Sequence, residues 1–337
     1  MVSVYDIAEL TGVSATTVSN VLNGRGRFSN KTRDLVLKVA QEQGYVVNLA
    51  ARGLHSGRSH TAGIITTDVS NDYFSSIVLE IERLMRTSGY TSFICNTLYD
   101  PDQLVAYVQE LRQRNSDGIF IVGGTAPDNL AALTSQPLVL IDFYSNGTLP
   151  ANSVTVRTDL FQATADQVVT LARHGCRRIV FLLLDAPGSY RPGHPIYQGY
   201  RAGLAACGLP LYEELELIGP HRKKSRMESR ELVLDLIDSG AEFDGVLAVG
   251  DRQALGAVEA LQERGLTPGH DVRVIGLDNS LYSQLYTPSI STVERNTDEM
   301  ARVGAKAMLA MIEGKEPDAH EFTIPHRIIE RATTLGV

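Results

Sequence analysis

A short segment near the N-terminus carries the side chains whose types and spacing are most informative chemically. Val18 and Val21 are apolar, whereas four residues around them are small or polar. These four residues are Ala15, Thr16, Ser19 and Asn20. At helical spacing the two sets fall on opposite faces of one helix. A face of amide, hydroxyl and methyl groups suits contacts with base edges in a DNA major groove, where asparagine pairs best with adenine.

The preceding residues predict the element that would hold this helix in place. An earlier helix is indicated by apolar residues at helical spacing, which are Val4, Ile7, Ala8 and Leu10. Between the two helices, Gly12 permits a left-handed turn, Val13 can fill the joint and Ser14 is a good N-cap. This pattern is typical of a helix-turn-helix, whose second helix enters a major groove.

A third helix is predicted next. Ser29 or Asn30 would cap its start, and Gly44 would end it. Its expected buried stripe consists of Leu35, Val36, Val39 and Ala40. Residues 48–54 then form a helix-capable segment that is too short to be stable alone in water. From these residues alone, a short helix capped by Asn48 and a plain linker are both open.

Composition and charge bound the class of protein. The chain has 337 residues, of which 43% are hydrophobic, so two or three folded units with buried cores are expected. No apolar run approaches the roughly 18–20 residues that span a bilayer, and the first residues do not form a signal peptide. Cys95, Cys176 and Cys207 are odd in number and far apart, which excludes both a disulfide framework and a CxxC pair. We therefore expect a cytoplasmic protein.

The charge is distributed unevenly along the chain. Residues 1–60 hold seven basic and four acidic side chains, although the whole chain has a net charge of -8. A small basic head on a large acidic body suggests that the head meets a polyanion. A solvated surface with unevenly distributed charges would explain the same distribution without a polyanionic partner.

Beyond residue 60 the sequence alternates between apolar runs and segments of helical periodicity. Strands are expected at residues 62–66, 91–95, 118–122, 138–142, 179–184, 215–218, 246–249 and 272–277. Helices are expected at residues 74–88, 102–115, 160–174, 227–239 and 253–264. This alternation predicts an α/β fold with parallel sheets covered on both faces, and its length predicts two similar lobes.

Sequence signatures of catalysis are missing. The chain contains no GxGxxG, P-loop, GxSxG or HExxH motif, and its eight histidines lack metal-ligand spacing. Together with the helix-turn-helix head, these absences lead us to expect a protein that is not an enzyme and that holds neither a metal nor another cofactor.

Residues 4–54 resemble the DNA-binding head of the lactose-repressor (LacI/GalR) family of bacterial transcription regulators. The motifs are Val4-Tyr5-Asp6-Ile7-Ala8, Gly12-Val13-Ser14, Thr17-Val18-Ser19-x-Val21-Leu22-Asn23, Lys31-Thr32-Arg33, Gly44-Tyr45 and Asn48-x-x-Ala51-Arg52-x-Leu54. The resemblance implies base contacts from Ala15, Thr16 and Asn20. It implies contacts to the DNA backbone from Ser14, Thr17, Ser19, Asn23, Ser29, Thr32 and Tyr45. Because many relatives carry arginine in place of Asn20, their guanine preference is not transferred.

Residues 48–54 resemble the hinge helix of this family, which forms only in the DNA-bound dimer. Asn48 and Ala51 match its motif, and Leu54 would enter a base step of the minor groove and kink the duplex. The resemblance implies a head at residues 1–46, a hinge and linker at 47–60, and an effector-binding and dimerisation domain at 61–337.

The body resembles a periplasmic sugar-binding protein, with two doubly wound lobes, three crossovers and an effector in the cleft. The motifs include Asn71-Asp72-Tyr73-Phe74, Gly199-Tyr200-Arg201-Ala202-Gly203, Gly250-Asp251-x-x-Ala254-Leu255-Gly256 and Val274-Ile275-Gly276-Leu277-Asp278-Asn279. The implied lobe one is 61–171 plus 295–321, and the implied lobe two is 172–293 plus 322–331.

Ligands of open α/β sheets bind beyond the carboxyl ends of the strands, which selects the effector candidates. These are Tyr73, Phe74, Asp159, Arg191, Asp278 and Arg295. Asp278 matches a carboxylate that in relatives accepts ligand hydroxyl or amine hydrogens. Each of these residues also has an alternative role. Tyr73 and Phe74 could serve helix packing, Asp159 could be an N-cap, and Arg295 could be an exposed residue of a crossover.

Two departures affect the identity of the effector. Ile196 stands where many sugar-binding relatives carry arginine, and Gly250 stands where many carry asparagine. Arg191 or His194 could substitute, and a phosphorylated, purine-like or bulkier ligand stays open beside a plain hexose. The run 221–224 would meet an anionic ligand or form a solvated loop.

The resemblance implies a homodimeric repressor on a palindromic double-stranded operator, controlled by a small-molecule effector. Tyr282, Leu285 and Tyr286 resemble part of the family's dimer surface, and no tetramer-forming tail is expected after Val337. There are two alternatives to this function. One is a soluble sugar-binding module without DNA function, and the other is an α/β enzyme with a fused head.

Overall fold

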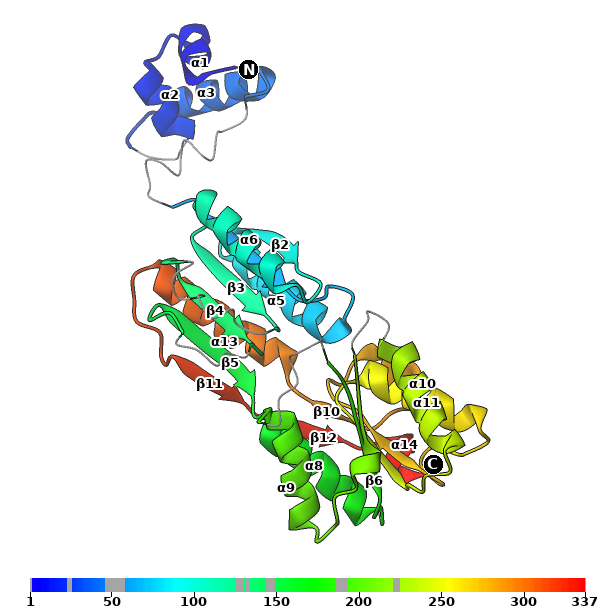
Figure 1. Ribbon diagram of the computed structural model, residues 1–337. Helices are drawn as coiled ribbons and strands as arrows, with labels where there is room; N and C mark the ends of the chain where they lie inside the picture. The colour runs from blue at the N-terminus through cyan, green and yellow to red at the C-terminus, as the bar shows by residue number, and fades with distance from the viewer. Residues whose placement is uncertain are drawn as a thin grey trace. The chain divides into compact units, whose positions relative to one another are not determined.

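The computed structural model describes residues 2–22, 26–45, 58–124, 130, 134–143, 149–185, 193–220 and 225–336. The chain divides into two compact units, a head of residues 1–60 and a body of residues 61–337 (Figure 1).

The described residues of the head form three helices around a small apolar core. Its helices are α1 (Val4–Thr11), α2 (Ala15–Leu22) and α3 (Asn30–Glu42). The buried core side chains are Ile7, Val18, Val21, Val36 and Ala40. Ser3 caps α1 in a capping box with Asp6, and Gly12 ends α1 at a left-handed φ of 71°. These local signals fix where each helix starts and stops.

The third helix corrects one expected core residue. Leu35 was expected in the buried stripe, but 42% of its surface is exposed, whereas its neighbour Val36 is fully buried. Successive residues of a helix are rotated by about 100°, so only Val39 and Ala40 share the face of Val36. Ser29, rather than Asn30, is the N-cap of α3.

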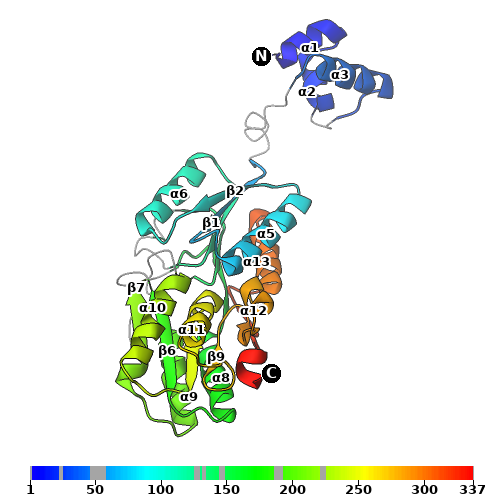
Figure 2. The ribbon, with the colours of Figure 1, turned by 90° about the vertical axis from the view of Figure 1, so that its right-hand side faces the viewer.

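Lobe one of the body is a six-stranded, fully parallel sheet with the order β11-β5-β4-β3-β1-β2. Its strands are β1 (Thr61–Thr66), β2 (Thr91–Asn96), β3 (Gly118–Val122), β4 (Leu138–Ile141), β5 (Ser153–Thr158) and β11 (Glu321–Ile324). Helices α5 (Asp72–Thr87) and α13 (Thr297–Ile312) cover one face, and α6 (Pro101–Gln113) covers the other (Figure 2).

Lobe two repeats the same winding with a four-stranded parallel sheet of order β7-β6-β8-β9. Its strands are β6 (Ile179–Asp185), β7 (Glu216–Pro220), β8 (Gly245–Ala248) and β9 (Arg273–Ile275). Helices α8 (Leu160–Arg173) and α9 (Pro195–Ala206) pack on one face, and α10 (Ser225–Asp238) and α11 (Asp251–Glu263) pack on the other. The short helices are η1 (Glu213–Leu215), α12 (Leu281–Leu285) and α14 (Ala332–Leu335).

The boundaries between the lobes differ from those expected. Helix α8 was placed in lobe one, but its apolar residues pack with β6 and α9 in the core of lobe two. Strand β11 was divided between the lobes at residue 321, but it pairs with β5 in the sheet of lobe one. The chain therefore crosses to lobe two after β5, returns to lobe one after β10 (Thr292–Glu294) and crosses again after β11. Strands β10 and β12 (Arg327–Ile329) pair antiparallel at the crossovers.

Candidate DNA-binding face and interlobe cluster

Helix α2 has two chemically distinct sides. Val18 and Val21 are buried against Ile7 of α1. Thr16 and Asn20 are exposed, and Ala15 and Ser19, although half-buried, are also outside the core. The Ser14 hydroxyl accepts a hydrogen bond from the Thr17 amide at 3.1 Å and lies 2.8 Å from the Thr17 hydroxyl. The buried valines thus fix which side chains α2 presents outward.

Helix α3 begins with the same arrangement. Ser29 accepts a hydrogen bond from the Thr32 amide at 3.1 Å, and the two hydroxyl oxygens lie 2.8 Å apart. Tyr45, which follows α3, packs half-buried against the core of the head. Four of the predicted backbone-contacting residues thus lie at helix N-termini, where the macrodipole favours phosphate. The predicted contacts at Asn23, Asn48, Ala51 and Leu54 lie outside the described residues.

A buried cluster joins the two lobes of the body. Arg295 follows β10, and only 4% of its side chain is exposed. Its Nη1 donates to Asp278 Oδ1 of lobe two at 3.2 Å, and its Nη2 donates to Asp142 Oδ1 of lobe one. Its guanidinium lies 4.2 Å from the ring centre of Tyr73. We call Tyr73, Asp142, Asp278 and Arg295 the interlobe cluster.

The backbone around the cluster aims both carboxylates toward the arginine. Asp142 directly follows β4 with a φ of 52°, and Asp278 follows β9 by three residues with a φ of 111°. Such positive φ values cost energy in residues other than glycine and often mark functional sites. Burial raises the pKa of Asp278 well above its usual value, and the positive charge of Arg295 opposes this shift. The cluster thus holds two carboxylates on one guanidinium at the carboxyl ends of both sheets.

Phe74 and Thr67 lie beside the cluster, in lobe one. A Cβ built on Gly123, whose φ is 74°, would lie 2.5 Å from Phe74 Cε1 and 3.0 Å from the Thr67 hydroxyl. The buried Thr67 hydroxyl has no hydrogen-bond partner among the described residues. An unsatisfied buried hydroxyl is costly, so this atom is suited to a hydrogen bond from a bound molecule.

The other predicted effector residues are placed differently. Asp159 is exposed and caps α8 by accepting the Gln162 amide hydrogen at 3.0 Å, which is the alternative role that the sequence allowed. Arg191 and residues 221–224 lie outside the described residues. Ile196 is buried in the core of lobe two. A Cβ on Gly250 would lie 3.8 Å from Asp278 Oδ2, so that a larger residue there would reach the cluster.

Asp142 and Arg252 join the lobes but escaped the sequence analysis. Asp142 ended a predicted strand, and the rule that ligands bind beyond strand ends would have selected it. Arg252 lies in the first turn of α11 in lobe two, and its guanidinium reaches Asp68 and Asp72 of lobe one. Its only sequence signal was its position next to Asp251 in a family motif.

Asp251 is a buried carboxylate that holds lobe two together behind the cluster. It accepts hydrogen bonds from the Ser280 amide at 2.6 Å and from the Thr292 hydroxyl at 2.5 Å. Burial raises its pKa from 3.8 to about 6, although these hydrogen bonds oppose the shift. Ionisation of Asp251 therefore costs more in the folded protein than in the unfolded chain.

This raised pKa predicts a pH dependence of stability. Between pH 3.8 and about 6 the folded state binds more protons at Asp251 than the unfolded chain does, so its contribution falls as the pH rises. The unfolding free energy of the wild type, minus that of Asp251→Asn, should fall by roughly 2 kcal/mol between about pH 4 and pH 7. Urea denaturation of both proteins across this range measures the difference, and parallel curves would contradict the prediction.

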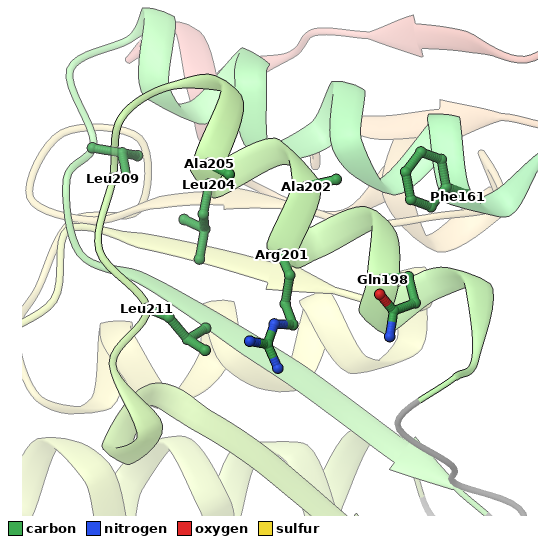
Figure 3. A pocket seen from close by; sticks show the side chains of 8 residues that line it. All are labelled: Phe161, Gln198, Arg201, Ala202, Leu204, Ala205, Leu209 and Leu211. Carbon is green, nitrogen blue, oxygen red and sulfur yellow. The ribbon is translucent and has the colours of Figure 1, made fainter.

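Two shallow hollows lie away from the cluster, along α8 and α9. The first is lined by Phe161, Arg201, Leu209 and Leu211 among others, and Figure 3 shows Gln198 and Arg201 extending from one side of α9. The second shares Leu209 and continues to Arg173 and Arg177. None of the predicted effector residues that the structure describes lines either hollow. Among the described residues, no group of His, Cys, Asp or Glu is arranged to hold a metal, and no helix could span a membrane.

Comparisons with known proteins cover both units of the chain. Residues 3–48 match the model of bacterial regulatory proteins of the lacI family, and residues 168–334 match a periplasmic binding protein-like domain. An HTH-type transcriptional regulator of Lachnoclostridium phytofermentans is 30% identical over 340 residues, which cover 98% of this chain and 99% of the relative. Catabolite control protein A of Staphylococcus epidermidis is 28% identical over 333 residues, covering 99% of both chains. The ribose operon repressor of Halalkalibacterium halodurans is 26% identical, covering 100% of this chain and 98% of the relative.

Solved structures share the fold. A lac repressor dimer bound to operator and an anti-inducer has a TM-score of 0.85 at 24% identity, with 99% of each chain covered. A CelR–cellobiose complex has a TM-score of 0.70 at 23% identity, with 99% of this chain and 100% of that chain covered. The relatives are named as regulators rather than as enzymes. The full-length match at 30% identity and the head motif together show that this chain belongs to the lacI family of bacterial regulatory proteins and is a DNA-binding transcriptional regulator.

Proposed function

We propose that the protein is a cytoplasmic, homodimeric repressor of a palindromic operator, whose DNA affinity depends on a small molecule held between the two lobes. The observation that carries the proposal is the two-sided α2, in which Val18 and Val21 are buried while Thr16 and Asn20 are exposed. One such helix covers a half-site, so two heads related by a two-fold axis read a palindrome. The Ser14 and Ser29 helix starts would set the register on the DNA backbone.

Asn20 should determine one base pair of each half-site. Its side chain is exposed on α2, and amide groups discriminate adenine from other bases by about 1–3 kcal/mol. In a selection on random DNA, Asn20→Ala should therefore lose the preference of the wild type at one symmetric position. Binding assays on single-base variants of the selected operator would measure the loss.

Thr32→Val serves as the matched control, because Thr32 lies at a helix start and would contact the DNA backbone. It should weaken binding to every sequence alike and leave the selected consensus unchanged. An unchanged consensus for Asn20→Ala would show that α2 does not read bases as proposed.

The interlobe cluster supports an effector that forms many hydrogen bonds. Asp278 and Arg295 present acceptors and donors from lobe two and the crossover, and Thr67 adds a hydroxyl from lobe one. Similar proteins include a ribose operon repressor and a CelR–cellobiose complex, which favours a sugar. A thermal-shift screen with sugars, sugar phosphates and nucleobases identifies the class, because a ligand that binds the folded state stabilises it.

Exposed apolar side chains on the body support a dimer. On α12, Leu281 is 59% and Leu285 is 73% exposed, beside the half-exposed Tyr282. Phe93 is exposed on β2, the edge strand of lobe one. Apolar patches and open sheet edges are surfaces that another chain commonly covers. Tyr286, also expected in this surface, is half-buried and hydrogen-bonds to Gln262.

Residues 48–54 would connect the effector to the DNA. We place the hinge helix here on the motif alone, with Leu54 entering the minor groove at the centre of the operator. An effector that changes the spacing of the two copies of lobe one would change how these segments pair.

A further inference from the structure

A second arginine joins the lobes at a place separate from the interlobe cluster. Arg252 lies in the first turn of α11 in lobe two, and its Nη2 donates to the Ser70 carbonyl oxygen of lobe one. Its Nη1 lies 3.7 Å from Asp68 Oδ2, and its Nη2 lies 3.9 Å from Asp72 Oδ1. Both of its carboxylate partners among the described residues are thus in lobe one. One turn of lobe one, residues 68–72, supplies all three acceptors.

Hydrogen bonds within the turn itself fix its shape without the arginine. Asp68 Oδ1 accepts the Ser70 amide hydrogen at 2.9 Å, and the Asp68 carbonyl accepts the Asn71 amide hydrogen at 3.1 Å. The Asn71 side chain caps α5 by accepting the Tyr73 amide hydrogen at 3.1 Å. Asp68 therefore uses one carboxylate oxygen for its own turn and offers the other to Arg252. The turn leads directly into Tyr73, whose ring faces Arg295.

Lobe two holds the base of Arg252 firmly. The preceding residue, Asp251, is fixed by the Ser280 amide and the Thr292 hydroxyl. The Arg252 guanidinium also lies 5.7 Å from the ring centre of Tyr282. A rigid base and a rigid turn reduce the entropy lost when the arginine joins them, so the contact is favoured when the lobes approach.

The two interlobe arginines differ in their exposure to water. The Arg252 side chain is 25% exposed, whereas the Arg295 side chain is 4% exposed. Ions screen exposed charge pairs strongly and buried pairs weakly. Added salt should therefore weaken the Arg252 contact while the buried interlobe cluster persists.

We propose that Arg252 is a latch that holds the two lobes together before any effector binds, by docking onto the turn at residues 68–72. Its strength sets the fraction of molecules in which the lobes are in contact. The latch thereby sets how much binding energy an effector must supply or overcome. This regulatory meaning rests on the proposed effector site between the lobes, but the contact itself is tested without effector or DNA.

Hydrogen exchange of the full-length protein tests the latch. The variant is Arg252→Gln, and the matched control is Arg264→Gln, whose arginine pairs with Asp238 at 2.6 Å within lobe two. A lost hydrogen bond to a charged group should raise the exchange rate of the amides in residues 68–76 roughly tenfold in Arg252→Gln. Arg264→Gln should leave the exchange of this segment unchanged.

A salt series separates a latch from general loosening of the fold. Raising the salt concentration from about 50 mM to about 500 mM should speed exchange of this segment in the wild type toward the rate of Arg252→Gln. The same change should have little effect on Arg252→Gln, and Arg252→Lys should restore part of the salt response. Equal melting temperatures of the variants and the wild type would show that all of them fold.

Two results would overturn the latch. One is an unchanged exchange rate of residues 68–76 in Arg252→Gln, and the other is a salt response that this variant shares with the wild type. Neither result would affect the DNA selection or the thermal-shift screen, so the latch can fail while the proposed function stands. Conversely, failure to select an operator would leave the exchange results interpretable.

Discussion

Replacing Arg295 with methionine should lower the unfolding free energy of the body by about 3–5 kcal/mol at neutral pH, because the loss of one partner leaves buried charge uncompensated. Asp142 and Asp278 both hydrogen-bond to this guanidinium, and all three side chains are buried or nearly so. Methionine fills a similar space and supplies neither charge nor donors. Urea denaturation measures this change when the recorded signal reports the unfolding of residues 61–337.

The matched control removes the carboxylate charges together with the arginine. Arg295→Met combined with Asp142→Asn and Asp278→Asn should recover most of the lost stability, since buried ion pairs exchanged for neutral groups cost little. Because burial already raises the pKa of Asp278, the defect of Arg295→Met alone should also shrink as the pH falls and this carboxyl takes up a proton. A single variant as stable as the wild type at neutral pH would show that the cluster does not hold the lobes.

Operator binding should weaken steeply with salt although the whole chain is acidic. Arg27, Lys31 and Arg33 are exposed around the start of α3 in the head. If each of these three side chains contacts one phosphate from each head of a dimer, about six counterions leave the DNA on binding. The slope of the logarithm of the binding constant against the logarithm of the salt concentration is then about -5. The affinity should then fall roughly a thousandfold between about 50 and 200 mM salt. Titration of the selected operator at several salt concentrations gives the slope.

Charge-neutralising variants locate the source of this slope. Lys31→Gln and Arg33→Gln should each reduce its magnitude by about two, because every variant removes one contact from each of the two heads. Lys306→Gln, which alters an exposed lysine paired with Asp318 on the body, should leave the slope unchanged. A slope near zero for the wild type would show that the head does not neutralise phosphates.

The sequence alone predicted the head in nearly full detail, because its signals are local. Gly12 ends the first helix, Ser14 and Ser29 cap the next two, and Val18 and Val21 mark the buried side of α2. Each of these effects acts within about one helical turn, so the order of residues is sufficient. Leu35 was wrongly predicted to be buried because it is next to Val36 in the sequence. The rotation of about 100° between successive helix positions turns its side chain away from the core.

In the body, the sequence predicted the fold class and most of the strands but not the assignment of α8 to a lobe. The chain passes from β5 to α8 through the single residue Asp159. The apolar stripe of α8 has the same periodicity whichever sheet it covers, so only tertiary packing shows that it belongs to lobe two. Strands β5, β10, β11 and β12 were not among the predicted strands. In β5 and β11 polar residues interrupt the apolar ones, and β10 and β12 are short segments of three residues each, so none of the four forms an apolar run.

The candidate effector site was predicted in part, since Tyr73, Asp278 and Arg295 were selected while Asp142 and Arg252 were not. The Asp142–Arg295 pair spans 153 residues of sequence, and the Arg252–Ser70 contact spans 182. No local pattern marks such a pair, because each partner by itself is an ordinary polar residue at the end of a strand or the start of a helix. The sequence determined which side chains stand at the carboxyl ends of the strands. Only the tertiary structure, by bringing the ends of two separate sheets together, decided which charges meet and become buried.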